Sequence, residues 1–105
     1  MTLDYIRELV VSVDENAGHY ESAYNESDAF TVWHEIQERT LPGDNTRAET
    51  IIMFQIDRYT KEEDDEIAAA IKQALTDDER IGFDYLVDYD RPSGYIHHIF
   101  DCEGI

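Results

Sequence analysis

The sequence predicts an α+β fold in which N-terminal helices pack on a small, mostly antiparallel sheet of three strands. Three observations predict this class. The run from Glu49 to Tyr59 has the apolar composition of a strand, residues 60–75 carry apolar side chains at helical spacing, and residues 81–102 alternate on both sides of a turn. Together these segments form a strand–helix–strand–strand unit over residues 49–102 within a single acidic domain, residues 1–105.

The N-terminal half is expected to be helical. Residues 2–14 place apolar side chains at helical intervals behind Thr2, a residue suited to an N-cap: Leu3, Ile6, Leu9, Val10 and Val13. The run Val10–Val13 would equally suit a strand, and that alternative stays open.

Two further segments before residue 49 also favour helix. Residues 19–25 carry two tyrosines four positions apart, which suits a short helical turn. A longer helix is predicted behind a cap at Ser27 or Asp28. It runs through Ala29, Trp33, Ile36 and Gln37, with Phe30 and Leu41 alongside. Leu41–Asn45 contains Pro and Gly and is expected to end that helix and lead into the first strand.

The central helix has the clearest signals. Thr60 and Glu63 have the spacing of a capping box, which predicts a helix from Thr60 to Leu75. Glu62, Glu63, Asp64 and Asp65 would then occupy its first turn, where the helix dipole stabilises anions. The apolar stripe that follows is Ile67, Ala70, Ile71, Ala74 and Leu75.

The strands after this helix alternate in period two. Residues 81–90 and 94–102 are expected to form a hairpin around Asp90–Gly94, where Pro92 fixes φ and Gly94 is free to take a positive φ. A strand–helix–strand order implies a right-handed crossover. The final strand could lie between the other two or outside them.

Alternation also divides the side chains between two faces of the sheet. The face toward the central helix would carry Ile52, Phe54, Phe83, Tyr85 and Phe100. The other face would show an apolar centre, Ile51, Met53, Leu86 and Ile99, rimmed by Asp57, Asp84, Asp88, Asp90 and Asp101. Such a surface suits a basic partner. Cover of this centre by the predicted Trp33 helix is the favoured alternative.

Charge is the dominant feature of the composition. The 105 residues include 25 acids and 8 bases, for a net charge of −17, and the acids are spread along the whole chain. Direct binding of nucleic acid is disfavoured because it requires clusters of Lys and Arg. With 42% hydrophobic residues the chain can build a core despite the charge.

The membrane, signal-peptide and cysteine patterns of the sequence all favour a cytoplasmic protein. No apolar run approaches the roughly 18 residues of a membrane span, and the N-terminal residues lack a signal-peptide pattern. Cys102 is the only cysteine, so it has no internal disulfide partner, and a buried role in a reducing cytoplasm is expected.

No motif predicts catalysis, a metal or a cofactor. His97, Asp101 and Glu103 share one strand face, but alternate residues are about 6.6 Å apart along a strand, too far to chelate tightly. The acids at 62–66 lack the spacing of a calcium loop. Nucleophile elbows and phosphate loops are absent from the sequence. The protein is therefore expected to be a non-enzymatic binding protein.

Two classes of function fit these observations. The first is an inhibitor that presents carboxylates to a basic, nucleic-acid-binding protein such as a nuclease, by mimicry of nucleic acid or by plugging its groove. In size and charge the chain resembles phage anti-restriction and anti-CRISPR proteins and toxin immunity proteins. The candidate partner-binding residues are Asp57, Glu62, Glu63, Asp64, Asp65, Asp84, Asp88, Asp90 and Asp101.

In the second class the acidity serves a salt-rich environment. Only two lysines accompany six arginines, which fits the surface of a halophilic protein of unrelated role. The oligomeric state is open, with a homodimer among the possibilities.

Overall fold

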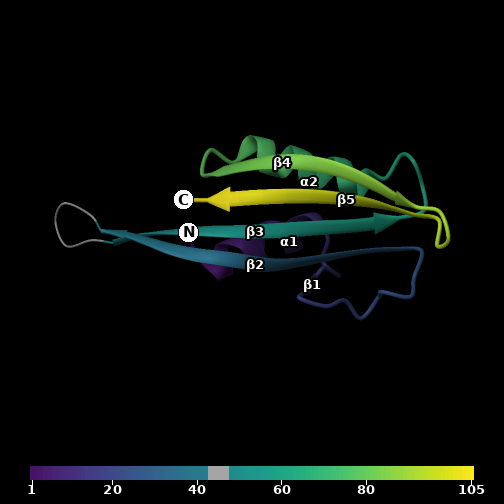
Figure 1. Ribbon diagram of the computed structural model, residues 1–105, viewed down its shortest axis with the longest axis horizontal. Helices are drawn as coiled ribbons and strands as arrows, with labels where there is room; N and C mark the ends of the chain where they lie inside the picture. Colours follow the sequence, from purple (N-terminus) through teal and green to yellow (C-terminus); the bar gives the residue numbers. More distant parts are fainter. Residues whose placement is uncertain (43–47) are drawn as a thin grey trace.

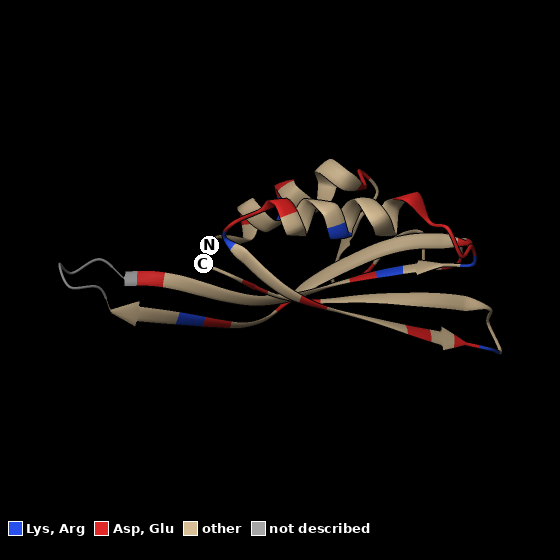
Figure 2. Ribbon diagram, turned by 90° about the horizontal axis from the view of Figure 1, so that it is seen from above, with Lys and Arg blue, Asp and Glu red and all other residues tan. Residues whose placement is uncertain are grey.

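The part of the chain that the structure describes has two helices on one face of a five-stranded mixed sheet (Figures 1 and 2). The computed structural model describes residues 1–42 and 48–105. The elements in chain order are α1 (Leu3–Val13), β1 (Gly18–His19), β2 (Ala29–Pro42), β3 (Ala48–Thr60), α2 (Glu66–Asp77), β4 (Ile81–Asp90) and β5 (Tyr95–Gly104). The strand order is β1-β2-β3-β5-β4, with β1 parallel to β2 and the remaining neighbours antiparallel.

The α+β class is correct, but the prediction of three strands is wrong because the N-terminal half supplies two more. The predicted Trp33 helix is strand β2, which pairs with β3 over its whole length except at a bulge between Glu35 and Gln37. The sequence Phe30-Thr31-Val32-Trp33 is rich in β-branched and aromatic residues, which favour a strand. Thr31 and Trp33 are buried while Phe30 and Val32 are only half-buried, which is the period of two.

The prediction of a short helical turn at residues 19–25 is also wrong. Gly18 and His19 pair with Val32 and Trp33 as β1, and the chain then turns until β2 begins. Gly18 has no room for a side chain, because a Cβ there would lie 1.8 Å from the carbonyl oxygen of Glu21. Of the predicted loop, Leu41 and Pro42 belong to β2, and residues 43–45 lie outside the described residues.

Helix α1 agrees with its sequence prediction. Thr2 is the N-cap, and its Oγ1 accepts a hydrogen bond from the Tyr5 amide at 3.1 Å. Val10 lies within the helix and is buried, which settles the alternative of a strand at this point.

The N-cap of helix α2 lies five residues later than the capping box predicted, at Asp65 in place of Thr60. Thr60 ends β3, and its hydroxyl accepts from the Glu62 amide at 3.1 Å, so no box with Glu63 forms. Asp65 is the N-cap instead, accepting from the Ala68 amide at 2.9 Å. Asp65 is favoured because its carboxylate also binds Arg58, which fixes the cap in place.

Strand β5 lies between β3 and β4, which settles the position that the sequence left open. The β4–β5 register runs without a shift from Ile81–Gly104 to Asp90–Tyr95. Gly94 takes the positive φ expected of the turn, 79°, and its amide donates to the Asp90 carbonyl at 2.8 Å.

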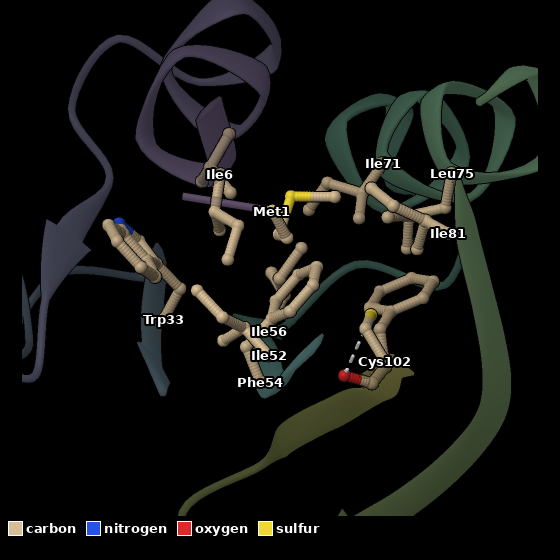
Figure 3. Packing of buried hydrophobic residues seen from close by; sticks show 12 residues of the cluster. Met1, Ile6, Trp33, Ile52, Phe54, Ile56, Ile71, Leu75, Ile81 and Cys102 are labelled. Atoms are coloured by element: carbon tan, nitrogen blue, oxygen red, sulfur yellow. Dashed lines mark hydrogen bonds between the residues drawn. The ribbon is translucent and has the colours of Figure 1, made fainter. Parts of the chain in front are cut away.

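The hydrophobic core fills the space between the helices and one face of the sheet (Figure 3). Ile6 and Val10 of α1 and Ile71 and Leu75 of α2 point toward the sheet. The strands contribute Trp33, Ile52, Phe54, Ile56, Ile81, Phe100 and Cys102. Burial of Cys102 agrees with its prediction as a small buried hydrophobe.

Candidate interaction surface

The sheet face opposite the helices, here called the open face, is not covered by any element that the structure describes (Figure 2). Cover by a Trp33 helix is ruled out, because Trp33 lies on β2, is 1% exposed and packs in the core beneath the helices. Met53 and Ile99 on the open face are half-buried, and Leu86 is 51% exposed.

Two carboxylates stand directly opposite each other on the open face. Asp84 of β4 and Asp101 of β5 are partners in the register, and both are exposed. Like charges in such a cross-strand pair repel. Glu103 follows Asp101 on the same face, beside a shallow hollow of about 480 Å³ that Ile36 and Met53 also line.

Asp57 also lies on the open face, but its carboxylate is occupied. It is 5% exposed, and its Oδ1 is 2.6 Å from His97 Nε2 and accepts from Gln55 Nε2 at 2.8 Å. The His97 ring stacks on Tyr59 at 4.1 Å between centroids. Burial, with the Asp57 charge adding to it, raises the pKa of Tyr59. Asp57 is therefore hydrogen-bonded within an aromatic cluster, and its buried carboxylate is not exposed to a partner protein.

Asp65 lies on the opposite, helix-covered side of the sheet, in a buried ion pair. Its carboxylate accepts from Arg58 Nε at 2.8 Å and from Arg58 Nη2 at 3.1 Å. Burial alone raises the pKa of Asp65, but the Arg58 hydrogen bonds and the Ala68 amide outweigh burial and hold it below 3.8. Asp65 is thus a structural residue.

The other predicted acids divide into two groups. Glu62, Glu63 and Asp64 are exposed in the segment that leads into α2. Glu63 and Asp64 line a hollow on the helix side with Tyr85 and His98. Asp88 and Asp90 are exposed on β4, in the same row as Asp84. The structure therefore gathers Asp84, Asp88, Asp90 and Asp101 on one side and places the acids before α2 on the other.

Sequence reasoning missed a buried polar network around Arg58. Arg58 is 5% exposed, and besides Asp65 it reaches Thr31 Oγ1 at 3.2 Å and Asp14 Oδ2 at 3.5 Å. The sequence did contain a signal for this network, an arginine in the inward-facing row of a strand. Phe54, Ile56, Arg58 and Thr60 occupy alternate positions that all face the helices. An arginine on that row must find buried anionic partners.

His98 and Tyr85 form a second pair that the sequence did not reveal. His98 Nδ1 is 2.6 Å from the Tyr85 hydroxyl, whereas its Nε2 is buried with no partner among the described residues. Burial lowers the pKa of His98. The imidazole is therefore held neutral next to the start of α2.

Within 1–42 and 48–105, no group of three or more His, Cys, Asp or Glu side chains could hold a metal ion. Neither described helix has the length and apolar character needed to cross a membrane.

Comparison with known proteins gives a likeness of fold alone. No family model matches the chain, and no curated protein matches it. Among solved structures, it is similar to a chain in the virion of a native gene transfer agent particle, with a TM-score of 0.52 and 13% identity. The match covers 90% of this chain and 81% of that one. The likeness therefore extends over most of both chains and concerns the fold alone.

Proposed function

We propose that the protein is a small structural subunit of a phage-like particle, which acts by binding neighbouring protein subunits. The fold shared with a virion chain supports this role. The observation that carries it is a projecting arm, defined as residues 38–42 of β2 and 48–51 of β3. A subunit of a particle needs surfaces that are buried only when neighbouring subunits pack against them. The arm is a surface of this kind.

The arm is a two-stranded ribbon without further support from the sheet. The β3–β5 pairing ends at Ile52 and Gly104, so residues 48–51 of β3 pair with β2 alone (Figure 1). A two-stranded ribbon by itself is marginally stable in water. Residues 38–42 are all exposed, and Leu41 and nearby Ile36 are 39% and 56% exposed. Packing against another subunit would bury these side chains and stabilise the arm.

The test is whether the protein enters particles through its arm. Particles from the source cells, separated on a density gradient, are expected to contain the chain at a fixed ratio to the other proteins, measured by mass spectrometry. Leu41→Ser, within the arm, should move the chain to the soluble fractions. The matched control is Val11→Ser, on the 40% exposed Val11 of α1, which should still be incorporated. A wild-type chain found only in the soluble fractions would contradict the proposal.

A second candidate function is inhibition of a basic, nucleic-acid-binding protein, such as a nuclease of a defence system. The observation that favours it is the Asp84–Asp101 pair, because a cation placed between two opposed carboxylates would relieve their repulsion. Binding of this kind weakens steeply as salt is added. Titration of the chain against such a nuclease at rising salt would test the idea, and an affinity independent of salt would eliminate it.

A further inference from the structure

The backbone groups along the free edge of β4 are used by neither proposed function, although Asp84 of this strand belongs to the carboxylate pair of the second one. Among the described strands, β4 is the last of the sheet and pairs only with β5, along its full length of 10 residues. The backbone N–H and C=O groups on its other side point away from the sheet. Edge strands normally avoid pairing by means of charged side chains, lysine above all, or by proline, a bulge or short length. β4 contains no lysine or proline, and its register with β5 is unbroken. Its charged side chains are aspartates, which would repel an acidic strand but attract a basic one.

The side chains of β4 form two rows of different chemistry. Toward the helix side, Tyr85, Val87 and Tyr89 are 36%, 54% and 57% exposed. Toward the open face the row consists of Asp84, Leu86, Asp88 and Asp90, all exposed. An added strand would therefore meet an apolar, aromatic row on one side and a carboxylate row on the other.

The carboxylate row selects the partner. If a second copy of β4 paired antiparallel about Leu86, Asp84 of one chain would oppose Asp88 of the other, and like charges would repel. A strand with Lys or Arg at alternate positions would oppose the aspartates favourably. Its intervening apolar side chains would contact Val87 and the two tyrosines.

We propose that β4 binds an extended segment of a partner protein as an added strand, with basic residues at every second position facing the aspartates and apolar residues between them. Main-chain hydrogen bonds supply the binding and the alternation supplies the specificity, as in other cases of strand addition. The inference rests on β4 alone and holds whether or not the protein belongs to a particle.

The first probe is a synthetic peptide of 10 residues, the length of β4, with Lys at odd positions and Val at even ones. The control peptide has the same composition, with its lysines in one block and its valines in another. The alternating peptide is expected to bind about tenfold more tightly than the block peptide, because only it matches both rows. On binding, amide exchange of the chain should slow within residues 82–90. Equal affinities, or protection elsewhere only, would overturn the proposal.

A second probe separates strand addition from general attraction to a chain of net charge −17. The alternating peptide with N-methyl groups on every second amide keeps its charge but loses donors on one edge. Methylation of the edge that pairs should reduce affinity about tenfold, and methylation of the other edge should change it less than about threefold. If neither methylated form loses affinity, binding is electrostatic only and the proposal fails.

Variants of the chain then locate the site. Asp84→Lys combined with Asp88→Lys should lower the affinity for the alternating peptide at least about tenfold. The control, Glu8→Lys combined with Glu15→Lys, changes the net charge by the same amount at exposed positions on and just after α1. It should lower the affinity for the alternating peptide less than about threefold. Asp84→Asn with Asp88→Asn serves if the lysine variant does not fold. Equal losses would overturn the proposal, as would sedimentation that shows a dimer with β4 already protected in the free protein.

Discussion

Arg58 connects four parts of the molecule through one side chain. Its guanidinium contacts the residue that ends α1 (Asp14), the N-cap of α2 (Asp65) and Thr31 of β2, while its backbone belongs to β3. Each partner is nearly inaccessible to water, so each depends on the others for its hydrogen bonds. The network thus fixes where both helices lie on the sheet.

Removal of this guanidinium should be one of the more damaging single changes. Arg58→Met leaves two buried carboxylates without their cation, which costs about 3–5 kcal/mol of the free energy of unfolding. Arg39→Met, on the exposed arm, should cost less than about 0.5 kcal/mol. Urea denaturation followed by circular dichroism measures both. An Arg58 variant as stable as the wild type would show that the network carries no net stabilisation.

Asp65 should make stability depend on pH in acid. Its pKa in the folded protein lies below the ordinary 3.8, so the unfolded chain binds the proton more readily. Its contribution is therefore complete above pH 3.8 and is lost as pH falls through the lower, folded value. The stability difference between wild type and Asp65→Asn, which keeps a good helix cap, should be constant near neutrality and shrink below pH 3.8. A difference that grows in acid would contradict this.

At the scale of elements, secondary structure could be predicted where the apolar residues followed a single period. The prediction failed where the same residues fitted both the helical period and the strand period. Residues 81–102 alternate cleanly and form the predicted hairpin. In residues 29–37, Ala29, Trp33 and Ile36 also fall at helical spacing. Because of this coincidence the segment was predicted as a helix. Pairing with β3 decides the outcome, and this long-range contact is not visible in local sequence. The position of β5 depends on contacts of the same kind.

The arm should be the least protected part of the sheet in the isolated chain. Amides of residues 49–51 are expected to exchange with solvent much faster than those of residues 54–58, because only the latter lie in the interior of the sheet, with pairing on both sides of β3. Hydrogen exchange followed by nuclear magnetic resonance gives both sets. Equal protection in the two segments would mean that the arm needs no neighbour.

At the scale of the whole molecule, the sequence predicted the acidity but could not place it. Of the predicted acids, Asp57 is buried and Asp65 is half-buried, both with partners inside the chain, and the remainder divide between the two sides of the sheet. Which carboxylates face outward depends on the fold, and the side chains that occupy the inward ones, Arg58 and His97, come from other positions. The alternation of β4 and β5 did place Asp84 and Asp101 on one face, and the register makes them direct partners.

Net charge should make the folded protein more stable in salt. Screening weakens the mutual repulsion of the 25 acids, so the free energy of unfolding by urea should rise between about 0.05 M and about 1 M sodium chloride. A protein adapted to salt-rich surroundings should moreover be unfolded in dilute buffer, as judged by circular dichroism. Stability that falls as salt is added would show that favourable ion pairs outweigh the repulsion.

Burial of Cys102 has a practical consequence for biophysical labelling. The thiol is 5% exposed, and burial, with the Asp101 charge adding to it, raises its pKa, so little reactive thiolate is present. At Gly82, near the start of β4, an added side chain would meet open space. A Gly82→Cys protein would therefore accept a maleimide dye or a nitroxide at one defined position, with the native cysteine left in place.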